Sequence, residues 1–324
     1  MADILVIIPC LNEAQHLEKL VRGILAANSD LPLRIVIADG GSTDGTLTIA
    51  QKLQGEFSSV KLLNNPKRYQ SAGINLAVAT YGLGADYLIR IDAHADYPTN
   101  YIRMLVEEEA AMRAASIAVT MDTVGKSGFQ KAVAAAQNSA LGNGGSAHRN
   151  VPNGGEWVDH GHHALMRIDA FRAVGGYDET FSHNEDAELD ARLIAGGYKI
   201  WLTAKTKLTY YPRSSPMPLF KQYMSYGEGR ARNMLKHGSR PKLRQLIPAF
   251  VAPAVLLALA APMSPLAFWP AALWALICII YGIKLTIKAE DLQLATSGFA
   301  AMIMHLGWSI GFWKGMFLIQ RSAA

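Results

Sequence analysis

A run without any charged side chain, Leu246–Ile283, constrains this chain more than any other feature of its sequence. A second uncharged run, Leu292–Trp313, follows it. A helix of about 20 apolar residues crosses a bilayer, so the first run is long enough to cross twice, with a turn at 262–265. We therefore expect three transmembrane helices, near 246–263, 266–285 and 296–319, which together form a membrane anchor at 246–324.

The positive charge of the chain is concentrated just before these runs. Residues 213–244 contain eight Lys and Arg residues and one acid, Glu228, whereas the whole chain has a formal net charge of +5. Nucleic-acid-binding proteins usually spread basic residues over a folded face, whereas basic residues beside a span are typical of its cytoplasmic flank. We expect no nucleic acid partner, and a basic interfacial helical segment at 216–245.

The two cysteines, Cys10 and Cys278, exclude a disulfide framework and suit a reducing compartment. The N-terminal stretch has no basic leader, and its apolar run is too short for a signal peptide. These features predict that residues 1–215 form a domain that stays in the cytoplasm, attached to the inner (cytoplasmic) membrane of a bacterium.

Short apolar, β-branched runs alternate with helical patterns over the first 125 residues. The expected strands are Ile4–Pro9, Leu33–Asp39, Val60–Asn64, Tyr87–Asp92 and Ile117–Asp122. The expected helices are Ala14–Asn28, Thr46–Gly55, Gln70–Thr80 and Asn100–Ala115. Near-continuous apolar strands separated by helices indicate an α/β fold with a mainly parallel sheet covered on both faces.

Polar residues follow each of the first four expected strands, in the segments 9–13 (PCLNE), 39–45 (DGGSTDG), 65–68 (NPKR) and 92–94 (DAH). Ligands of parallel sheets bind beyond the carboxyl ends of the strands, so these segments predict one site. No GxGxxG follows the first strand and no GxxxxGK occurs, so neither a dinucleotide site nor a P-loop is supported. Carboxylates repel bare phosphate and instead favour a base, a ribose, or a metal that neutralises a diphosphate.

In this order the motifs resemble family 2 glycosyltransferases with the GT-A fold, and Asn184-Glu185-Asp186 fits that family's acidic base motif. The resemblance covers residues 3–235, and the anchored layout is most similar to bacterial exopolysaccharide glycosyltransferases of the succinoglycan type. It implies an inverting enzyme that adds one hexose, glucose from UDP-glucose, to a polyprenyl diphosphate-linked saccharide. The implied partners are this donor, this acceptor, the lipid bilayer and other polysaccharide-assembly enzymes.

The resemblance also implies roles for individual residues. Those implied to bind the nucleotide sugar are Pro9, Asn12, Glu13, Asp39, Gly41, Asp44, Arg68, Gly73, Asn75, Asp92, Glu185 and Arg230. Asp186 is the implied general base, which takes the proton of the acceptor hydroxyl. Asp92 and His94 are the implied ligands of Mn²⁺ or Mg²⁺. His94 stands where the family usually has a second aspartate, and imidazole favours Mn²⁺ over Mg²⁺.

The candidate contacts of the acceptor or its pyrophosphate are Trp157, Gln222, Tyr226 and Arg232. The last three lie where processive synthases have a QxxRW motif, but the tryptophan is absent here. Three spans are also too few to enclose a polysaccharide channel. Both observations favour the addition of a single sugar.

Structural roles compete with several of these assignments. Asn12, Asp44 and Asp186 are also suited to cap helices. The alternative for Trp157 is core packing, and for Arg230 and Arg232 it is binding of lipid headgroups. The alternative for His94, Lys67 and Arg68 is a solvated loop position. A zinc site at His160, His162 and His163 has no support from cysteines or from a helical HxxxH spacing.

Two other functions stay open at this point. One is a polyprenyl-phosphate glycosyltransferase, which would glycosylate polyprenyl phosphate itself. The other is a non-catalytic membrane scaffold that binds nucleotide sugars. Supplying polyprenyl phosphate alone distinguishes the first from the main expectation, and any sugar transfer excludes the second.

Overall fold

The computed structural model describes residues 2–144, 154–239 and 243–322. The chain forms two compact units, which we describe separately. The first comprises Met1–Met121 and Asn150–Thr209, and the second comprises Asp122–Arg149 and Tyr210–Ala324. The expected division at residues 215 and 245 concerns the roles of the segments, and it stays a prediction.

An eight-stranded sheet runs through the first unit in the order β3-β2-β1-β4-β7-β5-β8-β6. The strands are β1 Ile4–Cys10, β2 Leu33–Asp39, β3 Val60–Asn64, β4 Tyr87–Arg90, β5 Ser116–Thr123, β6 Glu156–Val158, β7 His162–Arg167 and β8 Ile200–Tyr210. Strands β1 to β4 are parallel, and β7 lies antiparallel between β4 and β5. The expected α/β fold is confirmed. Because β1 lies between β2 and β4, the order of the strands reverses there, and a ligand crevice is expected at their carboxyl ends.

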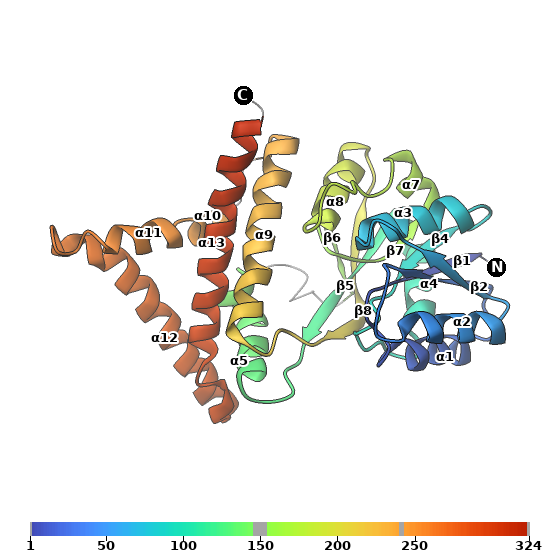
Figure 1. Ribbon diagram of the computed structural model, residues 1–324, viewed down its shortest axis with the longest axis horizontal. Helices are drawn as coiled ribbons and strands as arrows, with labels where there is room; N and C mark the ends of the chain where they lie inside the picture. Colours follow the sequence, from blue (N-terminus) through green and yellow to red (C-terminus); the bar gives the residue numbers. More distant parts are fainter. Residues whose placement is uncertain (1, 145–153, 240–242, 323–324) are drawn as a thin grey trace. The chain divides into compact units, whose positions relative to one another are not determined.

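Helices cover both faces of this sheet. They are α1 Leu17–Ala27, α2 Thr46–Glu56, α3 Gln70–Tyr81, α4 Tyr101–Met112, α7 Ile168–Ala173 and α8 Glu185–Ala195. Helices α3, α7 and α8 lie on one face, and α1, α2 and α4 on the other (Figure 1). On the first face Ile7 and Leu88 of the sheet share a core with Ile74 of α3 and Leu193 of α8. Each fully buried aliphatic side chain contributes about 1.5–3 kcal/mol, so the strand ends are firmly placed.

The second unit is helical. Its helices are α5 Gly128–Gln137, α6 Ala140–Asn143, α9 Pro216–His237, α10 Leu243–Ala249, α11 Val251–Ala258, α12 Trp269–Ala289 and α13 Ser297–Ser322, with 3-10 turns η2 Pro265–Phe268 and η3 Leu292–Leu294. Within the described ranges, one helix, Pro265–Ala289, is long and apolar enough to cross a membrane. The segment Leu246–Ala258 is apolar but shorter. The number of crossings therefore stays a prediction.

Candidate active site

The Gly-rich turn after β2 is organised by the buried carboxylate of Asp39. This carboxylate accepts hydrogen bonds from the backbone N–H groups of Gly41 (2.9 Å) and Ser42 (3.1 Å), and from the Ser42 hydroxyl (2.5 Å). Gly41 has a φ of +85°, which glycine adopts at no steric cost. Pro9 at the end of β1 pairs with Ala38, next to Asp39. The turn therefore lies where β1 and β2 end together.

Asn12 and Asp44 join the loop after β1 to this turn. The side-chain oxygen of Asn12 accepts from the backbone N–H of Thr43 (2.8 Å), and Asp44 accepts from the N–H of Ala14 (3.1 Å) and from Thr46. Helix α1 begins only at Leu17, and no side chain caps it. The capping alternative for Asn12 is therefore wrong, and the side chain of Asn12 instead holds two loops together.

Arg68, after β3, lies over the Gly-rich turn. Its φ of +65° is left-handed, and a side-chain carbon placed on Gly41 would lie 3.8 Å from the guanidinium. Lys67 instead forms an ion pair with Glu179, and 67% of the Lys67 side chain is exposed. Of the two candidate cations, Arg68 is the one that the structure brings to the turn.

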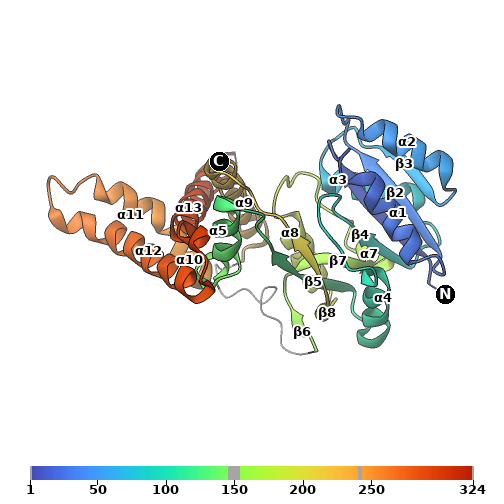
Figure 2. The same ribbon diagram turned by 90° about the horizontal axis from the view of Figure 1, so that it is seen from below.

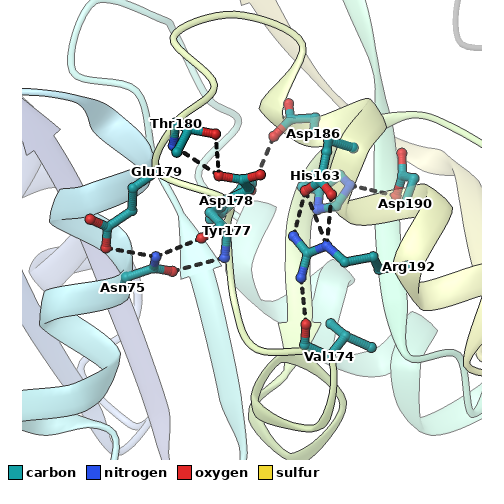
Figure 3. Close-up of polar contacts among 11 residues, drawn as sticks. Asn75, His163, Val174, Tyr177, Asp178, Glu179, Thr180, Asp186, Asp190 and Arg192 are labelled. Carbon is teal, nitrogen blue, oxygen red and sulfur yellow. Dashed lines mark hydrogen bonds and ion pairs between the residues drawn. The ribbon is translucent and has the colours of Figure 1, made fainter. Parts of the chain in front are cut away.

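Gly73 and Asn75 of α3 serve packing in this structure. A side-chain carbon at Gly73 would lie 2.9 Å from the Asn65 amide and 3.3 Å from Ala38, so glycine lets α3 approach β2 closely. Asn75 donates to the Tyr177 carbonyl (2.8 Å) and accepts from the Tyr177 N–H (2.9 Å), as Figure 3 shows. Asn75 thus fixes the loop that carries Tyr177.

A buried arginine, Arg90, connects the two acids that the sequence analysis placed at the centre of the chemistry. Its Nη1 lies 2.7 Å from Oδ1 of Asp186 and its Nε lies 3.4 Å from Oδ1 of Asp92. Only 5% of the Arg90 side chain is exposed. The amide oxygen of Gln70, in the orientation that satisfies both ends of the amide, accepts from Nε (2.9 Å) and Nη1 (3.1 Å) of Arg90. Strand β4, helix α3 and helix α8 therefore meet at one guanidinium.

The charges of this group follow from burial and from their neighbours. Burial opposes a charged arginine, but Asp186 and Asp92 outweigh burial and raise the pKa of Arg90 well above its usual value. Burial likewise opposes a charged Asp186, but Arg90 and the nearby histidines lower its pKa. The pKa of Asp92 is lowered against burial by Arg90 and His162. Both carboxylates are therefore ionised, with Arg90 as their main counter-ion.

Asp186 and Glu185 lie in the first turn of α8, and their environments differ. The residue that precedes the helix is Asn184, with a φ of +61°, and the Asp186 carboxylate bonds to Arg90 and to the Tyr177 hydroxyl (3.0 Å) rather than to the helix backbone. Asp186 therefore does not cap the helix by a hydrogen bond, although its place in the first turn of α8 still suits the helix dipole, as expected. Burial, reinforced by the charge of Asp186, raises the pKa of Glu185 to about 7.

The three histidines before and in β7 do not form a zinc site. His160 and His163 both bind Asp190, at 2.7 and 2.6 Å. His162 lies 3.9 Å from Asp92, and burial together with the Arg90 charge lowers its pKa to about 4, so it is neutral. In the ranges that the structure describes, no three His, Cys, Asp or Glu residues are grouped to hold a metal ion.

Asp92 and His94 fit a divalent ion that also binds a diphosphate. Such an ion needs only one or two protein ligands, because phosphate and water oxygens complete its coordination. Asp92 is ionised and its side chain is 23% exposed. His94 is close enough to lower the pKa of Asp92, and its Nδ1 lies 2.8 Å from the carboxylate of Glu13. Glu13 is thereby placed beside the candidate metal ligands.

The remaining candidates lie elsewhere. Trp157 is on β6, at the edge of the sheet, where it packs edge-to-face on Trp201 and is 46% exposed. The structure does not bring it to the group around Arg90. Four candidates, Gln222, Tyr226, Arg230 and Arg232, belong to α9 in the second unit, where the Gln222 amide donates to the hydroxyls of Tyr226 and Tyr210. Their roles stay predictions.

Three residues of the site, Arg90, Tyr177 and Gln70, are not indicated by the sequence motifs. A signal was available for Arg90, because a charged residue that ends an otherwise apolar strand requires a buried counter-ion. No local pattern distinguishes Tyr177 or Gln70 from ordinary core and helix residues. Both matter only through their contacts across the fold.

Known proteins are similar to this chain over most of its length. Residues 5–175 match the family described as "Glycosyl transferase family 2". The chain is 54% identical over 320 residues to the succinoglycan biosynthesis protein ExoA of Rhizobium meliloti (strain 1021), covering 99% of this chain and 97% of that protein. It is 26% identical over 239 residues to the dolichyl N-acetyl-alpha-D-glucosaminyl phosphate 3-beta-D-2,3-diacetamido-2,3-dideoxy-beta-D-glucuronosyltransferase of Methanococcus voltae, covering 70% and 72%.

Two solved structures share the fold. The mannosyltransferase PcManGT from Pyrobaculum calidifontis, in complex with GDP-Man and Mn²⁺, superposes with a TM-score of 0.60 at 17% identity, covering 94% of this chain and 86% of that one. GalNAc-T7 with UDP, GalNAc and Mn²⁺ has a TM-score of 0.55 at 15% identity, covering 72% and 48%. At these identities the likeness establishes the GT-A fold alone.

Proposed function

The chain belongs to glycosyl transferase family 2, and on that premise we propose that it adds one glucose, from UDP-glucose and with inversion, to a polyprenyl diphosphate-linked saccharide. Its similarity to a succinoglycan biosynthesis protein supports a role as an exopolysaccharide glycosyltransferase. The observation that carries the proposal is the arrangement of Asp92, Arg90 and Asp186 beside the strand ends that bear the Asp39 turn.

In this proposal the donor lies over the ends of β1, β2 and β4. The turn of Asp39, joined to Asn12, receives the nucleotide, and Arg68 contacts the diphosphate. A bound Mn²⁺ or Mg²⁺, held by Asp92 and His94, would neutralise charge on the leaving diphosphate. Support for a divalent ion comes from PcManGT and GalNAc-T7, both of which were solved with Mn²⁺.

Asp186 is the proposed general base. Within the described part of the chain, both hydrogen bonds to its carboxylate, from Arg90 and Tyr177, go to Oδ1. We assign Oδ2 to the acceptor hydroxyl, whose proton it removes while the oxygen attacks the anomeric carbon. Arg90 and Tyr177 hold the carboxylate in a fixed orientation, and Arg90 keeps it ionised.

The acceptor is proposed from the relatives. The Methanococcus voltae protein acts, by its name, on a sugar already linked to dolichyl phosphate. This favours a lipid-linked saccharide over bare polyprenyl phosphate. The proposed location is the cytoplasmic face of the inner membrane, where a membrane-associated enzyme meets such an acceptor at a raised effective concentration.

The direct test is transfer of labelled sugar by the purified full-length chain to extracted lipid-linked acceptors, with UDP-glucose compared with other nucleotide sugars. We expect UDP-glucose to be used, and Asp186→Asn to lose activity by about 10²–10⁴-fold while still binding UDP. Asp169→Asn, at an exposed carboxylate outside the site, is the matched control. Undiminished transfer by Asp186→Asn would show that Asp186 is not the base. Glycosylation of polyprenyl phosphate supplied alone would show that the acceptor is polyprenyl phosphate rather than a lipid-linked saccharide.

A further inference from the structure

Helix α9 packs along α13, and Figures 1 and 2 show the two helices side by side from two directions. Three glycines of α13, Gly307, Gly311 and Gly315, and Gly227 of α9 leave no room for a side chain at the contact. A carbon placed on any of them would overlap the facing helix, for example the Met224 carbonyl at Gly311. The two helices therefore touch backbone to backbone over several turns and must occupy the same environment.

That environment is not the hydrocarbon core of a bilayer. Helix α9 carries Lys221, Glu228, Arg230, Arg232 and Lys236. Glu228 forms an ion pair with Lys314 of α13 at 2.8 Å. Charged side chains at the bilayer centre are costly, and a transmembrane α13 would take all of these residues with it. The pair α9–α13 instead suits the membrane surface, where basic residues meet anionic headgroups.

Helices α11 and α12 have the opposite character. They form a hairpin that projects away from α13, with its tip at residues 259–268 (Figure 1). The tip carries no charge, and its apolar side chains are exposed, including Leu259 (76%), Met263 (90%) and Leu266 (76%). Only 11% of the apolar window of Pro265–Ala289 is buried within the protein. Lipid is the partner that would cover such a surface.

The hairpin is anchored to α13 at its base. Pro253 has no N–H to offer to the Ala249 carbonyl, and this carbonyl instead accepts from the Ser309 hydroxyl and the Trp313 indole, both at 2.8 Å. The Ala252 N–H donates to the Ser309 oxygen (2.9 Å). These bonds satisfy the backbone N–H and carbonyl groups that lack helical partners between α10 and α11. Neighbouring helices satisfy such groups in the same way at prolines of membrane helices.

The reach of the hairpin is short. Helix α11 spans about 9 Å from Ala252, held at α13, to Ala258 at 1.5 Å per residue, and the five residues on to Met263 add at most about 18 Å when extended. Helix α12 is longer, but it starts from the same tip and runs obliquely back to α13, where Gly282 packs on Gly298 (Figure 1). The shorter arm therefore limits how deep the tip can lie. The hydrocarbon core is about 30 Å thick. A hairpin that starts at the membrane surface therefore ends inside the bilayer, which also explains why its tip is uncharged.

We propose that the second unit is embedded in one leaflet only. The hairpin α11–α12 enters the bilayer and returns from the same side, the α9–α13 pair lies at the surface among anionic headgroups, and the two termini of the chain lie on the same side of the membrane. The proposal replaces the three expected crossings with none. It does not depend on the donor, the acceptor or the base.

The first test leaves the sequence intact. A fluorescent protein and an alkaline phosphatase are fused in turn to the C-terminus, and an N-terminal tag marks the side of the catalytic unit by its accessibility to protease. We expect fluorescence and no phosphatase activity, with both ends on the cytoplasmic side. Phosphatase activity, which any odd number of crossings would produce, would overturn the proposal.

The second test places a thiol at the tip. Because Cys10 and Cys278 are buried, the thiol of Met263→Cys is the one available to a membrane-impermeant maleimide. Leu292→Cys, at a site 85% exposed in the loop before α13, is the matched control. We expect Leu292→Cys to react from the cytoplasmic side and Met263→Cys to react from neither side until detergent is added. Reaction of Met263→Cys from either side of intact vesicles would contradict the proposal.

Discussion

Arg90 Nη1 lies 2.7 Å from Oδ1 of Asp186, and 96 residues of sequence separate the two side chains. The pair joins the end of β4 to the first turn of α8. Because Arg90 also contacts Asp92, the same guanidinium fixes the proposed base and the proposed metal ligand. Removing its charge should therefore affect both folding and catalysis.

Arg90→Met should destabilise the protein by about 3 kcal/mol, because two ionised and only partly exposed carboxylates would lose their cation. Arg90→Lys keeps a charge but not the planar fork, so it should recover much of this stability and little of the activity. Thermal unfolding in detergent and sugar transfer would be measured for both variants. Equal stability of Arg90→Met and the wild type would show that the pair contributes nothing to the fold.

The sheet is predictable from sequence because its strands are nearly continuous apolar runs. The expected ranges of β2 and β3 match the structure to the residue, and those of β1 and β5 differ by one residue at their ends. The expected strand Tyr87–Asp92 ends two residues earlier, at Arg90, although the Ile91 N–H still donates to the Ile7 carbonyl of β1 (3.0 Å), and the turn begins at Ala93. The convergence of Asp39 and Asp92 at one sheet edge follows from parallel topology alone.

The rest of the site is not predictable in the same way. Arg90, Gln70 and Tyr177 come together through packing of α3 and α8 on the sheet, and no spacing in the sequence encodes those contacts. The membrane segment shows the same limit. Hydropathy finds the uncharged runs, but the pairing of α13 with the charged α9 decides whether α13 can cross a bilayer.

Arg68→Ala should weaken donor binding by about 10- to 100-fold, since a charge-assisted hydrogen bond contributes about 1.5–3 kcal/mol. Lys67→Ala is the matched control, because its exposed pair with Glu179 contributes at most about 1 kcal/mol. The KM for the nucleotide sugar would be compared for the two variants. A larger rise in KM for Lys67→Ala than for Arg68→Ala would place the diphosphate against Lys67 instead.

Removal of divalent ions with EDTA should abolish transfer, and added Mn²⁺ should restore it. His94→Asp restores the more usual aspartate and should shift the preference from Mn²⁺ toward Mg²⁺, because a carboxylate is a harder ligand. The ratio of kcat/KM with the two ions measures this shift. His16→Ala, at an exposed histidine that precedes α1 and is not a proposed metal ligand, should leave the ratio unchanged. Activity that persists in EDTA would exclude the metal site.

Glu185 should make the stability of the protein fall as the pH rises through about 7. The pKa of this side chain is about 7 in the folded chain, against 4.5 for an ordinary glutamate. Between these two values the folded chain retains a proton that the unfolded chain has released, so raising the pH favours unfolding. Glu185→Gln cannot ionise, and its unfolding temperature should fall less between pH 6 and pH 8 than that of the wild type.

The control for this effect is Glu56→Gln, at a glutamate of α2 whose side chain is 38% exposed and which lies outside the site. Its unfolding temperature should depend on pH as the wild type does. Parallel curves for the wild type and Glu185→Gln would mean that Glu185 is ionised at pH 6. A second negative charge would then lie beside Asp186, and Arg90 would have to balance three carboxylates rather than two.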